Sequence, residues 1–330
     1  MNNIIGLSNN VEYNFNLKNK LRFKKKVGNV SQYYPLDLRS TYIKNDLNVI
    51  ANLYSINHPF VIFGECTNLY VTENGYNGLF IDIDHHFNGI EYIDKTKSFR
   101  VMADYDLDGF VKEAVKKGYD FTNFISIPGL VGSAVCGNSG SEGINIGKHV
   151  KSIKVFDFKK NDFSTIIPEN GFFKKRNSLI NEENKEKTNY LIIECELYAD
   201  YIGRDNCELK IKRKKDYRKY SDEDSFGTAG SFWRGAVLPE KYHNDGKKVR
   251  DLMKMIELNT VNFNGARYVT DKYFLKTEEH TTDKDVARLL KCTIDEIKNA
   301  FGFIPENEVI ILDHDGRIDV IEFIKRYLYH

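Results

Sequence analysis

The chain lacks the cysteine patterns that mark several protein classes. It has only five cysteines, at Cys66, Cys136, Cys195, Cys207 and Cys292, and no two of them are spaced as Cys-x-x-Cys. An odd and scattered set argues against a disulfide framework and against a zinc site, and it fits a reducing compartment. We therefore expect a cytoplasmic protein.

Long hydrophobic runs and an excess of one charge are also missing. No uninterrupted apolar run approaches the length that crosses a bilayer, and the residues after Met1 lack the basic and apolar regions of a signal peptide. Lys and Arg together number 48, against 47 Asp and Glu. Because no net field would attract a polyanion or a lipid surface, we expect neither nucleic acid nor a membrane as a partner.

The apolar content of the chain is ordinary for a globular protein. Its 330 residues, of which 41% are hydrophobic, suffice for two or three domains. Hydrophobic periodicity predicts strands at 21–28, 60–63, 69–72, 78–84, 90–93, 99–104, 150–157 and 189–198. It predicts helices at 44–55, 106–117, 248–258 and 283–301, with Asp283 near the N-cap of the last. This mixture favours an α+β fold over a doubly wound sheet.

Residues 203–226 are highly charged, and their centre is the basic run Lys210–Lys215. We interpret this segment as a solvated loop or linker, which is the usual role of a charge run. The alternative is that the run contributes to phosphate binding, because five of its six residues are basic.

Two short segments of small residues are the most informative part of the sequence. One is Ile127–Ala134, which continues to Asn138–Gly140, and the other is the loop Gly64–Asn68 between two apolar runs. A bare backbone of this kind can approach a phosphate or a flat ring closely, with N–H groups free to donate. The alternative for the Ile127 segment is a tight turn followed by a strand of small residues.

Together with Ala229-Gly230-Ser231-Phe232, these segments resemble the UDP-N-acetylenolpyruvoylglucosamine reductases, flavin enzymes that complete UDP-N-acetylmuramic acid for the bacterial wall. The resemblance runs from about Leu17 to about Leu312. It implies an α+β fold with a PCMH-type, vanillyl-alcohol-oxidase-like FAD-binding domain and a smaller α+β substrate-binding domain. The implied division is an N-terminal extension at 1–16, the FAD-binding domain at 17–202, the substrate-binding domain at 203–300 and a C-terminal segment at 301–330 that returns Glu308 to the active site.

Reducing an enol-ether double bond beside a carboxylate requires a hydride source, an acid and groups that stabilise an enolate. No ordinary side chain supplies hydride, so a redox cofactor is required. The resemblance implies FAD, reduced in turn by NADPH. It implies that Ser231 donates the proton, that Arg176 holds the substrate carboxylate and that Glu308 works with Arg176 at the developing enolate.

The residues alone leave simpler roles open for each of these three. Ser231 is also explained as a turn serine, and Arg176 as a surface residue of the basic loop 174–176. Glu308 is also explained as part of an exposed acidic turn, in which Glu306 competes for the assignment.

The resemblance also implies cofactor contacts from both loops: Gly64, Glu65, Cys66, Thr67, Asn68, Ile127, Pro128, Gly129, Gly132, Ser133 and Asn138. The first loop departs from the family pattern, since Glu65 and Cys66 stand where glycines are expected. A carboxylate at position 65 would repel a pyrophosphate unless it points away. Lys175 replaces the family's tyrosine before Arg176, and most other departures fall in the substrate half.

The predicted function is that of an FAD-dependent oxidoreductase that uses NADPH to reduce the enolpyruvyl group of UDP-N-acetylglucosamine-enolpyruvate in peptidoglycan precursor synthesis. Two alternatives remain: a relative acting on another sugar nucleotide in surface-polysaccharide synthesis, and a flavin-binding protein without turnover. Residues 82–86 and 313–315 look like metal clusters, but alternation along a strand divides them between two faces, so we expect no metal site. The sequence leaves the oligomeric state open.

Overall fold

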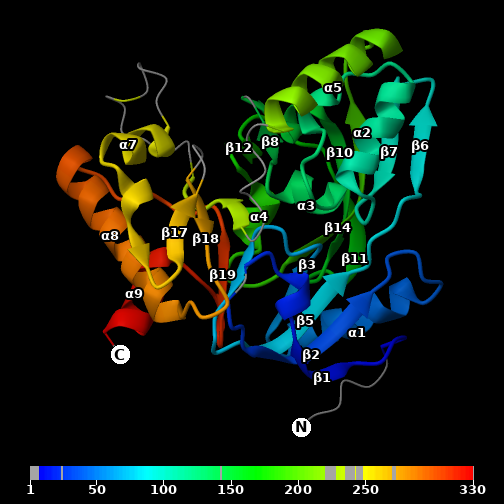
Figure 1. The fold of residues 1–330 in the computed structure, drawn as a ribbon. Coiled ribbons are helices and arrows are strands. Elements are labelled where there is room, and N and C mark those ends of the chain that lie inside the picture. The colour runs from blue at the N-terminus through cyan, green and yellow to red at the C-terminus, as the bar shows by residue number, and fades with distance from the viewer. Residues whose placement is uncertain are drawn as a thin grey trace. The chain divides into compact units, whose positions relative to one another are not determined.

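The structure, a computed structural model, describes residues 7–23, 25–141, 143–219, 228–234, 242, 248–269 and 273–329. The chain forms two compact units, each assembled from separate stretches of sequence (Figure 1). Unit 1 comprises Met1–Asn14, Ser31–Glu65 and Gly78–Asp216, and unit 2 comprises Phe15–Val30, Cys66–Asn77 and Tyr217–His330.

Unit 1 is built on a five-stranded antiparallel sheet with the order β11-β10-β14-β7-β6. These strands are Asp162–Ile166, Val150–Asp157, Tyr190–Tyr198, Ser98–Met102 and Ile90–Ile93. The sheet's central strand, β14, has Cys195 and Leu197 fully buried, as alternation on a half-covered sheet requires. A second sheet, most of whose residues belong to unit 1, has the order β1-β2-β5-β3. Its strands are Glu12–Asn16, Asn29–Leu36, Tyr76–Ile83 and Phe60–Phe63.

Helices and short hairpins complete unit 1. The helices are α1 (Ile43–Ser55), α2 (Leu107–Lys116), α3 (Val131–Cys136), α4 (Leu179–Glu183) and α5 (Arg204–Lys219). The short strands are β8 (Gly140–Ser141), β9 (Ile144–Asn145), β12 (Phe173–Lys174) and β13 (Asn177–Ser178). The 3-10 turns are Lys18–Lys20, Thr122–Phe124, Ile146–His149 and, in unit 2, Leu258–Thr260.

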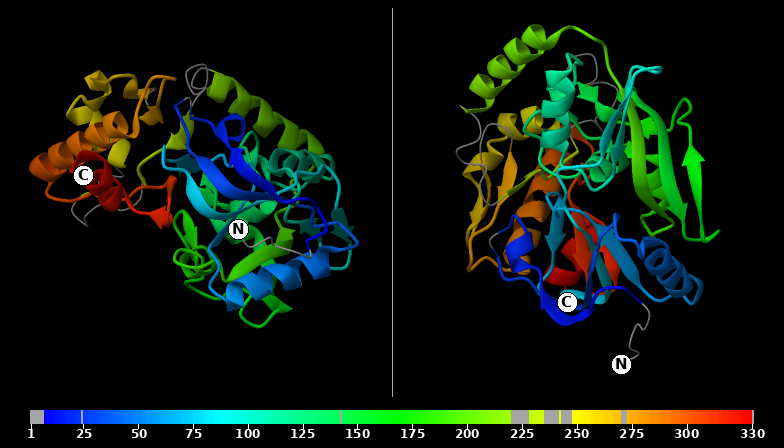
Figure 2. Two further views of the ribbon diagram at one scale, coloured as in Figure 1. Left: turned by 90° about the horizontal axis from the view of Figure 1, so that it is seen from below. Right: turned by 90° about the vertical axis from the view of Figure 1, so that its right-hand side faces the viewer.

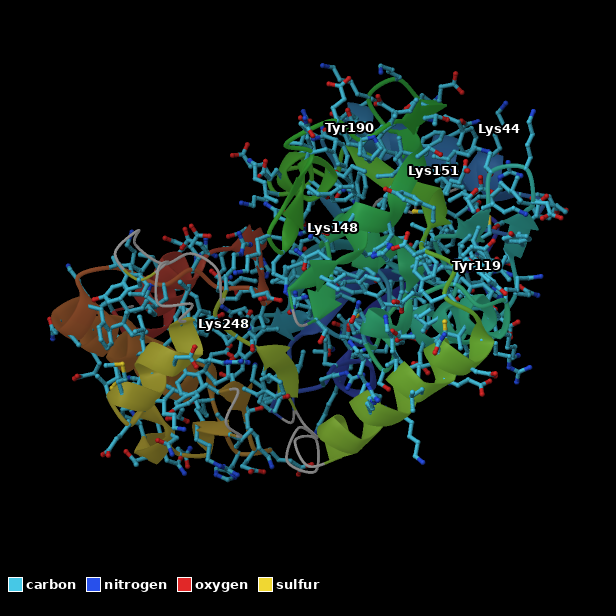
Figure 3. The ribbon with its side chains drawn as sticks, turned by 90° about the horizontal axis from the view of Figure 1, so that it is seen from above. Lys44, Tyr119, Lys148, Lys151, Tyr190 and Lys248 are labelled. Carbon is cyan, nitrogen blue, oxygen red and sulfur yellow. The ribbon has the colours of Figure 1, made fainter. Side chains whose placement is uncertain are left out.

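An aromatic cluster forms the centre of the unit 1 core between α2 and the five-stranded sheet. Phe110 and Phe121 meet edge to face with ring centroids 4.7 Å apart, and Phe99 of β7 lies 5.8 Å from Phe110. Tyr119, labelled in Figure 3, packs edge to face on Phe99 at 5.3 Å. Such pairs stabilise a fold beyond their buried area.

Within the residues that the structure describes, unit 2 combines two small sheets with helices α7, α8 and α9. One sheet has the order β20-β19-β4, with strands Gly316–Ile318, Ile310–Asp313 and Leu69–Val71. The other has the order β15-β18-β17-β16, with strands Thr228–Ser231, Phe274–Lys276, Ala266–Val269 and Asn262–Phe263. The helices are α7 (Val249–Met255), α8 (Asp283–Phe301) and α9 (Val320–Leu328), and α8 and α9 pack side by side (Figure 2).

A buried ion pair explains why two early stretches of the chain belong to unit 2. Lys25 Nζ lies 2.7 Å from Asp283 Oδ1, and both side chains are completely buried. The hydroxyl of Tyr70 donates to the same oxygen at 2.6 Å. Burial lowers the pKa of Lys25, and the carboxylate of Asp283 opposes that shift. The cluster therefore ties residues from 15–30 and 66–77 to the start of α8.

Most predicted elements are present, but two predictions are wrong. The described part of 21–28 holds no strand, because these residues instead carry Lys25 into the core of unit 2. Residues 204–219 form helix α5 rather than a loop. The helix buries Cys207 in the unit 1 core, and Lys210 of α5 pairs with Asp120 at 2.5 Å. The end of the predicted loop, 220–226, lies outside the described residues.

In the part of the chain that the structure describes, no helix combines the length and hydropathy needed to cross a bilayer.

Candidate functional site

The two loops of small residues approach each other in unit 1. Gly64 directly follows β3, which pairs in parallel with β5 up to Phe63 and Asp82. A Cβ atom built on Gly64 would lie only 2.9 Å from Leu130 Cδ1, so a larger residue here would displace the buried Leu130 side chain. Segments more than sixty residues apart in sequence are thus in contact at Gly64 and Leu130.

Glycine in the second loop serves a sharp turn and a close approach. Gly129 has a φ of +113°, which side chains of L-residues rarely adopt. A Cβ on Gly132 would lie 2.7 Å from the Cβ of Ala103, so α3 sits directly on that segment. Before the turn, Ile127 is half-buried and Pro128 is exposed.

The expectation that this loop has free N–H groups is wrong at two positions. The N–H of Val131 donates to the carbonyl of Tyr105 and that of Gly132 to the carbonyl of Ala103, both at 2.9 Å. The hydroxyl of Ser133 is also engaged, since it donates to the Leu130 carbonyl at 2.8 Å. These bonds anchor α3, which forms in place of the alternative strand.

Asn138 joins the second loop to the segment that carries Arg176. Its side chain is 3% exposed, and its φ of +47° is a left-handed conformation that asparagine tolerates. Asn138 Oδ1 accepts from the N–H of Gly147 at 2.9 Å, and Nδ2 donates to the carbonyl of Lys174 at 2.6 Å. The side chain therefore holds three chain segments together from within the core.

Arg176 lies in the two-residue connection between β12 and β13, with a φ of +57°. The hairpin is fixed at its far strand, where the Ser178 hydroxyl donates to the carbonyl of Cys136 at 2.6 Å. The neighbouring Lys174 pairs with Glu182 at 3.1 Å. The structure thus places Arg176 on a hairpin anchored to the end of α3, within the same unit as Gly64 and the second loop.

Glu65, which stands where a glycine is expected, is paired with a histidine. Its Oε1 lies 2.6 Å from Nδ1 of His85, and Nε2 of His85 lies 3.7 Å from Asp106 Oδ2. Asp106 caps helix α2 by accepting from the N–H of Gly109. The imidazole thus holds the Glu65 carboxylate in a contact within unit 1.

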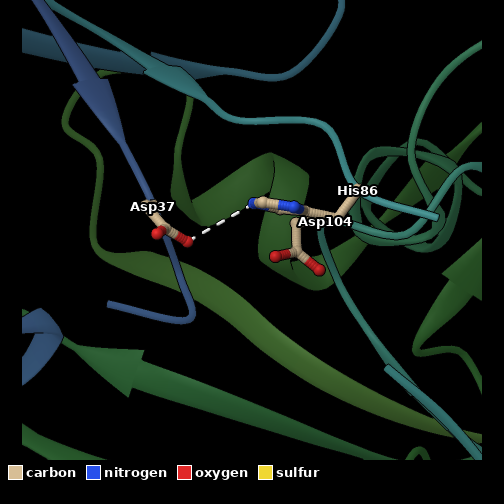
Figure 4. Close-up of side chains that lie close together, drawn as sticks. All are labelled: Asp37, His86 and Asp104. Carbon is tan, nitrogen blue, oxygen red and sulfur yellow. Dashed lines mark ion pairs between the residues drawn. The ribbon is translucent and has the colours of Figure 1, made fainter. Parts of the chain in front are cut away.

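The adjacent His86 belongs to a different group, shown in Figure 4. Its Nε2 lies 3.4 Å from Asp37 Oδ1, with Asp104 close by. Both oxygens of the buried Asp104 accept from Arg39, at 2.7 and 2.6 Å. His85 and His86 each lie close to two carboxylates from other segments, and no local pattern of the sequence indicates these pairings.

Three other predicted residues lie together in unit 2. The backbone N–H of Glu308 donates to the carbonyl of Phe232 at 2.7 Å, directly after Ser231 at the end of β15. Asn68 Nδ2 donates to the carbonyl of Glu308 at 3.1 Å, and the N–H of Ile310 donates to the carbonyl of Asn68 at 3.0 Å. Ser231, Asn68 and Glu308, which are far apart in sequence, are therefore held on one hydrogen-bonded framework.

Buried hydrogen bonds hold the segment after Ser231 to the rest of unit 2. The indole N–H of Trp233 donates to the Tyr268 hydroxyl at 2.7 Å, and that hydroxyl lies 2.9 Å from Thr293 Oγ1 on α8. Burial raises the pKa of Tyr268, so its hydroxyl stays neutral. Both Ser231 and Glu308 are half-buried, and neither is locked inside the core.

The remaining first-loop residues also belong to unit 2. Cys66 is buried with a φ of +53°, a conformation that explains why glycine would suit this position. Its carbonyl accepts from the N–H of Leu69 at 3.3 Å and closes the turn, which leaves Thr67 half-buried and Asn68 exposed. Arg176 belongs to unit 1, and Ser231 and Glu308 belong to unit 2.

These residues fit an FAD site on one specific test. The feature most adverse to a pyrophosphate was Glu65, and its carboxylate is engaged by His85. Gly64 leaves the start of its loop without a side chain, whereas Gly132 and Ser133 mainly serve the packing and hydrogen bonding of α3. Sequence reasoning missed His85 because its partner Glu65 lies twenty residues away.

Comparisons with known proteins show what the chain as a whole is similar to. The family described as "FAD binding domain" matches residues 46–160. A UDP-N-acetylenolpyruvoylglucosamine reductase of Clostridioides difficile is 26% identical over 271 residues, covering 81% of this chain and 84% of the relative. The Bacillus pumilus protein of the same name is 23% identical over 319 residues, covering 91% of this chain and 99% of the relative.

A solved structure supports the fold. The UDP-N-acetylenolpyruvylglucosamine reductase of Thermus caldophilus superposes with a TM-score of 0.67 at 18% identity, covering 92% of this chain and 98% of that one. The predicted α+β fold with a PCMH-type FAD-binding domain is therefore confirmed.

Proposed function

We propose that the chain is a divergent member of the UDP-N-acetylenolpyruvoylglucosamine reductase family and that it reduces UDP-N-acetylglucosamine-enolpyruvate with NADPH through bound FAD. The product would be the lactyl ether that peptidoglycan precursors contain. Five free cysteines support a reducing, cytoplasmic location for this activity.

One observation carries the proposal. The backbone N–H of Glu308 donates to the carbonyl of Phe232 at 2.7 Å, so the backbone of Glu308 is joined to the residue directly after Ser231, and this supports the proposal. Nothing in the local sequence requires residues 231 and 308 to meet. Their proximity is what the family's mechanism needs, because the acid and the group that works at the enolate must serve one substrate.

When bound, FAD would supply the hydride that no side chain can provide. We propose that Gly64 and the Ile127–Gly129 turn hold this cofactor, with Glu65 turned toward His85. Arg176 would bind the substrate carboxylate in a bidentate pair, a geometry that suits a guanidinium better than an ammonium group. The Oγ proton of Ser231 would pass to the carbon beside that carboxylate, and Glu308 would work with Arg176 at the developing enolate.

The proposal is tested by giving the purified protein NADPH and the enolpyruvyl sugar nucleotide. We expect a yellow protein with a flavin spectrum, loss of NADPH absorbance and a product heavier by two hydrogens. Ser231→Ala should lower kcat by a factor on the order of 100 or more, while the flavin spectrum stays the same. A protein that neither contains nor takes up flavin would contradict the proposal.

A second function, reduction of another sugar nucleotide, is favoured by the departures in the substrate half. Lys175 precedes Arg176 where the family has tyrosine, and Trp233-Arg234-Gly235 follows Phe232. A protein that binds FAD but leaves the enolpyruvyl compound unchanged would favour this second function. If flavin binding persists with every sugar nucleotide unreduced, a non-catalytic flavin protein becomes the better description.

A further inference from the structure

Arg234 lies on the framework that joins Ser231 and Glu308. Its backbone N–H donates to the carbonyl of Glu306 at 2.8 Å, and Trp233 forms an antiparallel bridge with Asn307. Two consecutive pairings thus tie residues 232–234 to residues 306–308. The guanidinium consequently belongs to the same small part of unit 2 as the proposed acid.

The guanidinium of Arg234 has an unsatisfied side. Its side chain is only 16% exposed, and its charge meets Glu306, which is 54% exposed, through one contact of 3.3 Å from Nη1 to Oε2. Its Nε is buried and has no acceptor within the described residues. Arginine cannot lose its charge in a protein, and a buried donor without an acceptor is rare in native structures. An acceptor from outside the chain would resolve this.

The partner Glu306 cannot neutralise the guanidinium well. A single long contact to a largely solvated carboxylate is weak, since water screens most of the attraction. A buried Lys or His at this position could lose its proton and become neutral. Arg keeps its charge and presents fixed N–H donors to an oxyanion. The residue type, its burial and its missing acceptor all point to an anionic ligand.

We propose that Arg234 binds a phosphate oxygen of the sugar-nucleotide substrate and so anchors the substrate beside Ser231. This inference rests on the proposed function, which assigns the substrate carboxylate to Arg176 and leaves the diphosphate without a partner. Arg234 is then a substrate-binding residue of unit 2 that determines affinity and orientation, while proton transfer stays with Ser231.

The test is calorimetric titration of the flavin-loaded protein with UDP-N-acetylglucosamine, which has the diphosphate but no enolpyruvyl carboxylate. We expect Arg234→Gln to raise Kd about tenfold to a hundredfold, the usual effect of losing a charge-assisted hydrogen bond to a bound phosphate. The Kd of Arg234→Lys should lie between that of the unsubstituted protein and that of Arg234→Gln. Flavin content and the Kd for FAD should stay the same, because the phosphate in question is the substrate's.

Glu306→Gln is the matched control. It removes the ion pair and keeps the guanidinium, so UDP-N-acetylglucosamine should bind as tightly as before or more tightly. If Arg234 serves only to clamp residues 306–308, the Gln variants at 234 and 306 should lose affinity and thermal stability equally, which would overturn the inference.

Other outcomes also decide the matter. An unchanged Kd in Arg234→Gln, or no binding by the unsubstituted protein, would overturn the inference. A loss of flavin with substrate binding intact would assign Arg234 to the cofactor and overturn it as well. If UDP-N-acetylglucosamine binding depends on Arg234 while the enolpyruvyl compound is not reduced, the inference stands and the proposed function fails.

Discussion

The carboxylate of Glu65 lies 2.6 Å from Nδ1 of His85, at the position where the sequence departs most clearly from a glycine-only loop. The side chains of Glu65 and His85 are 27% and 32% exposed, so both are half-buried and still reach solvent. A charge that would disfavour a dinucleotide is thus directed into a contact within unit 1. We therefore propose that this contact lets the loop hold an acidic residue beside a bound dinucleotide.

Replacing His85 should weaken flavin binding. In His85→Gln the Glu65 carboxylate loses its partner, and we expect the Kd for FAD to rise about two- to fivefold, the range of a partly exposed ion pair. Fluorescence titration of the apoprotein with FAD measures this. Adding Glu65→Gln to the same protein should restore the affinity. His86→Gln removes the adjacent imidazole, which contacts Asp37 instead, and should leave the Kd unchanged. Equal effects of the two histidines would contradict the assignment.

Asn138 should be among the most sensitive positions of unit 1. Asn138→Ala removes two buried hydrogen bonds and puts alanine, which tolerates the left-handed region less well than asparagine, at a φ of +47°. We expect a loss of about 2–4 kcal/mol in the free energy of unfolding. Urea unfolding followed by circular dichroism measures it. Asn138→Gly keeps the backbone conformation accessible, so its smaller loss isolates the hydrogen bonds. The exposed Asn161, with a φ of +53°, is the control, and its Ala variant should lose about 1 kcal/mol.

Strong periodicity made much of the secondary structure predictable. The strand at 60–63 and the helix at 283–301 have the bounds of β3 and α8. The cap of α8 is Thr282, which accepts from the N–H of Asp285, because Asp283 is buried against Lys25. Thr and Asp are both common N-cap residues, so the sequence alone does not distinguish Thr282 from Asp283. The contact of Asp283 with Lys25 determines which of the two caps the helix.

The long-range part of the candidate site could not be predicted from local patterns. The contacts of Glu65 with His85 and of Glu308 with Phe232 join residues twenty or more positions apart, and no periodicity encodes such pairs. The resemblance supplied Ser231, Arg176 and Glu308, but not Arg234. Helix α5 was missed because its mean hydropathy is low, and the burial of Cys207 alone does not reveal a packed face.

Asp313 should make the stability of unit 2 depend on pH in the acid range. Burial alone would raise the pKa of Asp313, but hydrogen bonds from Thr72, Tyr327 and Arg326, at 2.6, 2.8 and 2.8 Å, outweigh it and hold the pKa below its usual range. The folded chain therefore releases this proton more readily than the unfolded chain. The stabilisation is complete above about pH 4 and is lost as the pH falls below that value.

Asp313→Asn measures this contribution. Above about pH 5 the variant should lose about 2–4 kcal/mol, and the difference from the unsubstituted protein should shrink below about pH 4. Asp315→Asn, at a side chain that is 73% exposed, should change stability by about 0.5 kcal/mol or less at every pH. A difference at position 313 that is constant down to the acid transition would show that the charge of Asp313 is not responsible.

Lys25 and Lys26 are adjacent and chemically identical, but they should respond very differently to the same substitution. Lys25 is completely buried with its ammonium group 2.7 Å from Asp283, while Lys26 is exposed. In Lys25→Met the Asp283 carboxylate keeps its bond from Tyr70 but loses its counter-charge, and an uncompensated buried charge should cost about 3–5 kcal/mol. Lys26→Met should cost about 0.5 kcal/mol or less.

Adding Asp283→Asn to the Lys25 variant should recover part of the loss in the free energy of unfolding, because the unpaired charge is then gone. Urea unfolding monitored through Trp233, the single tryptophan and a residue of unit 2, provides the measurement. Equal losses at the two lysines would mean that the Lys25–Asp283 pair does not hold residues 15–30 to α8.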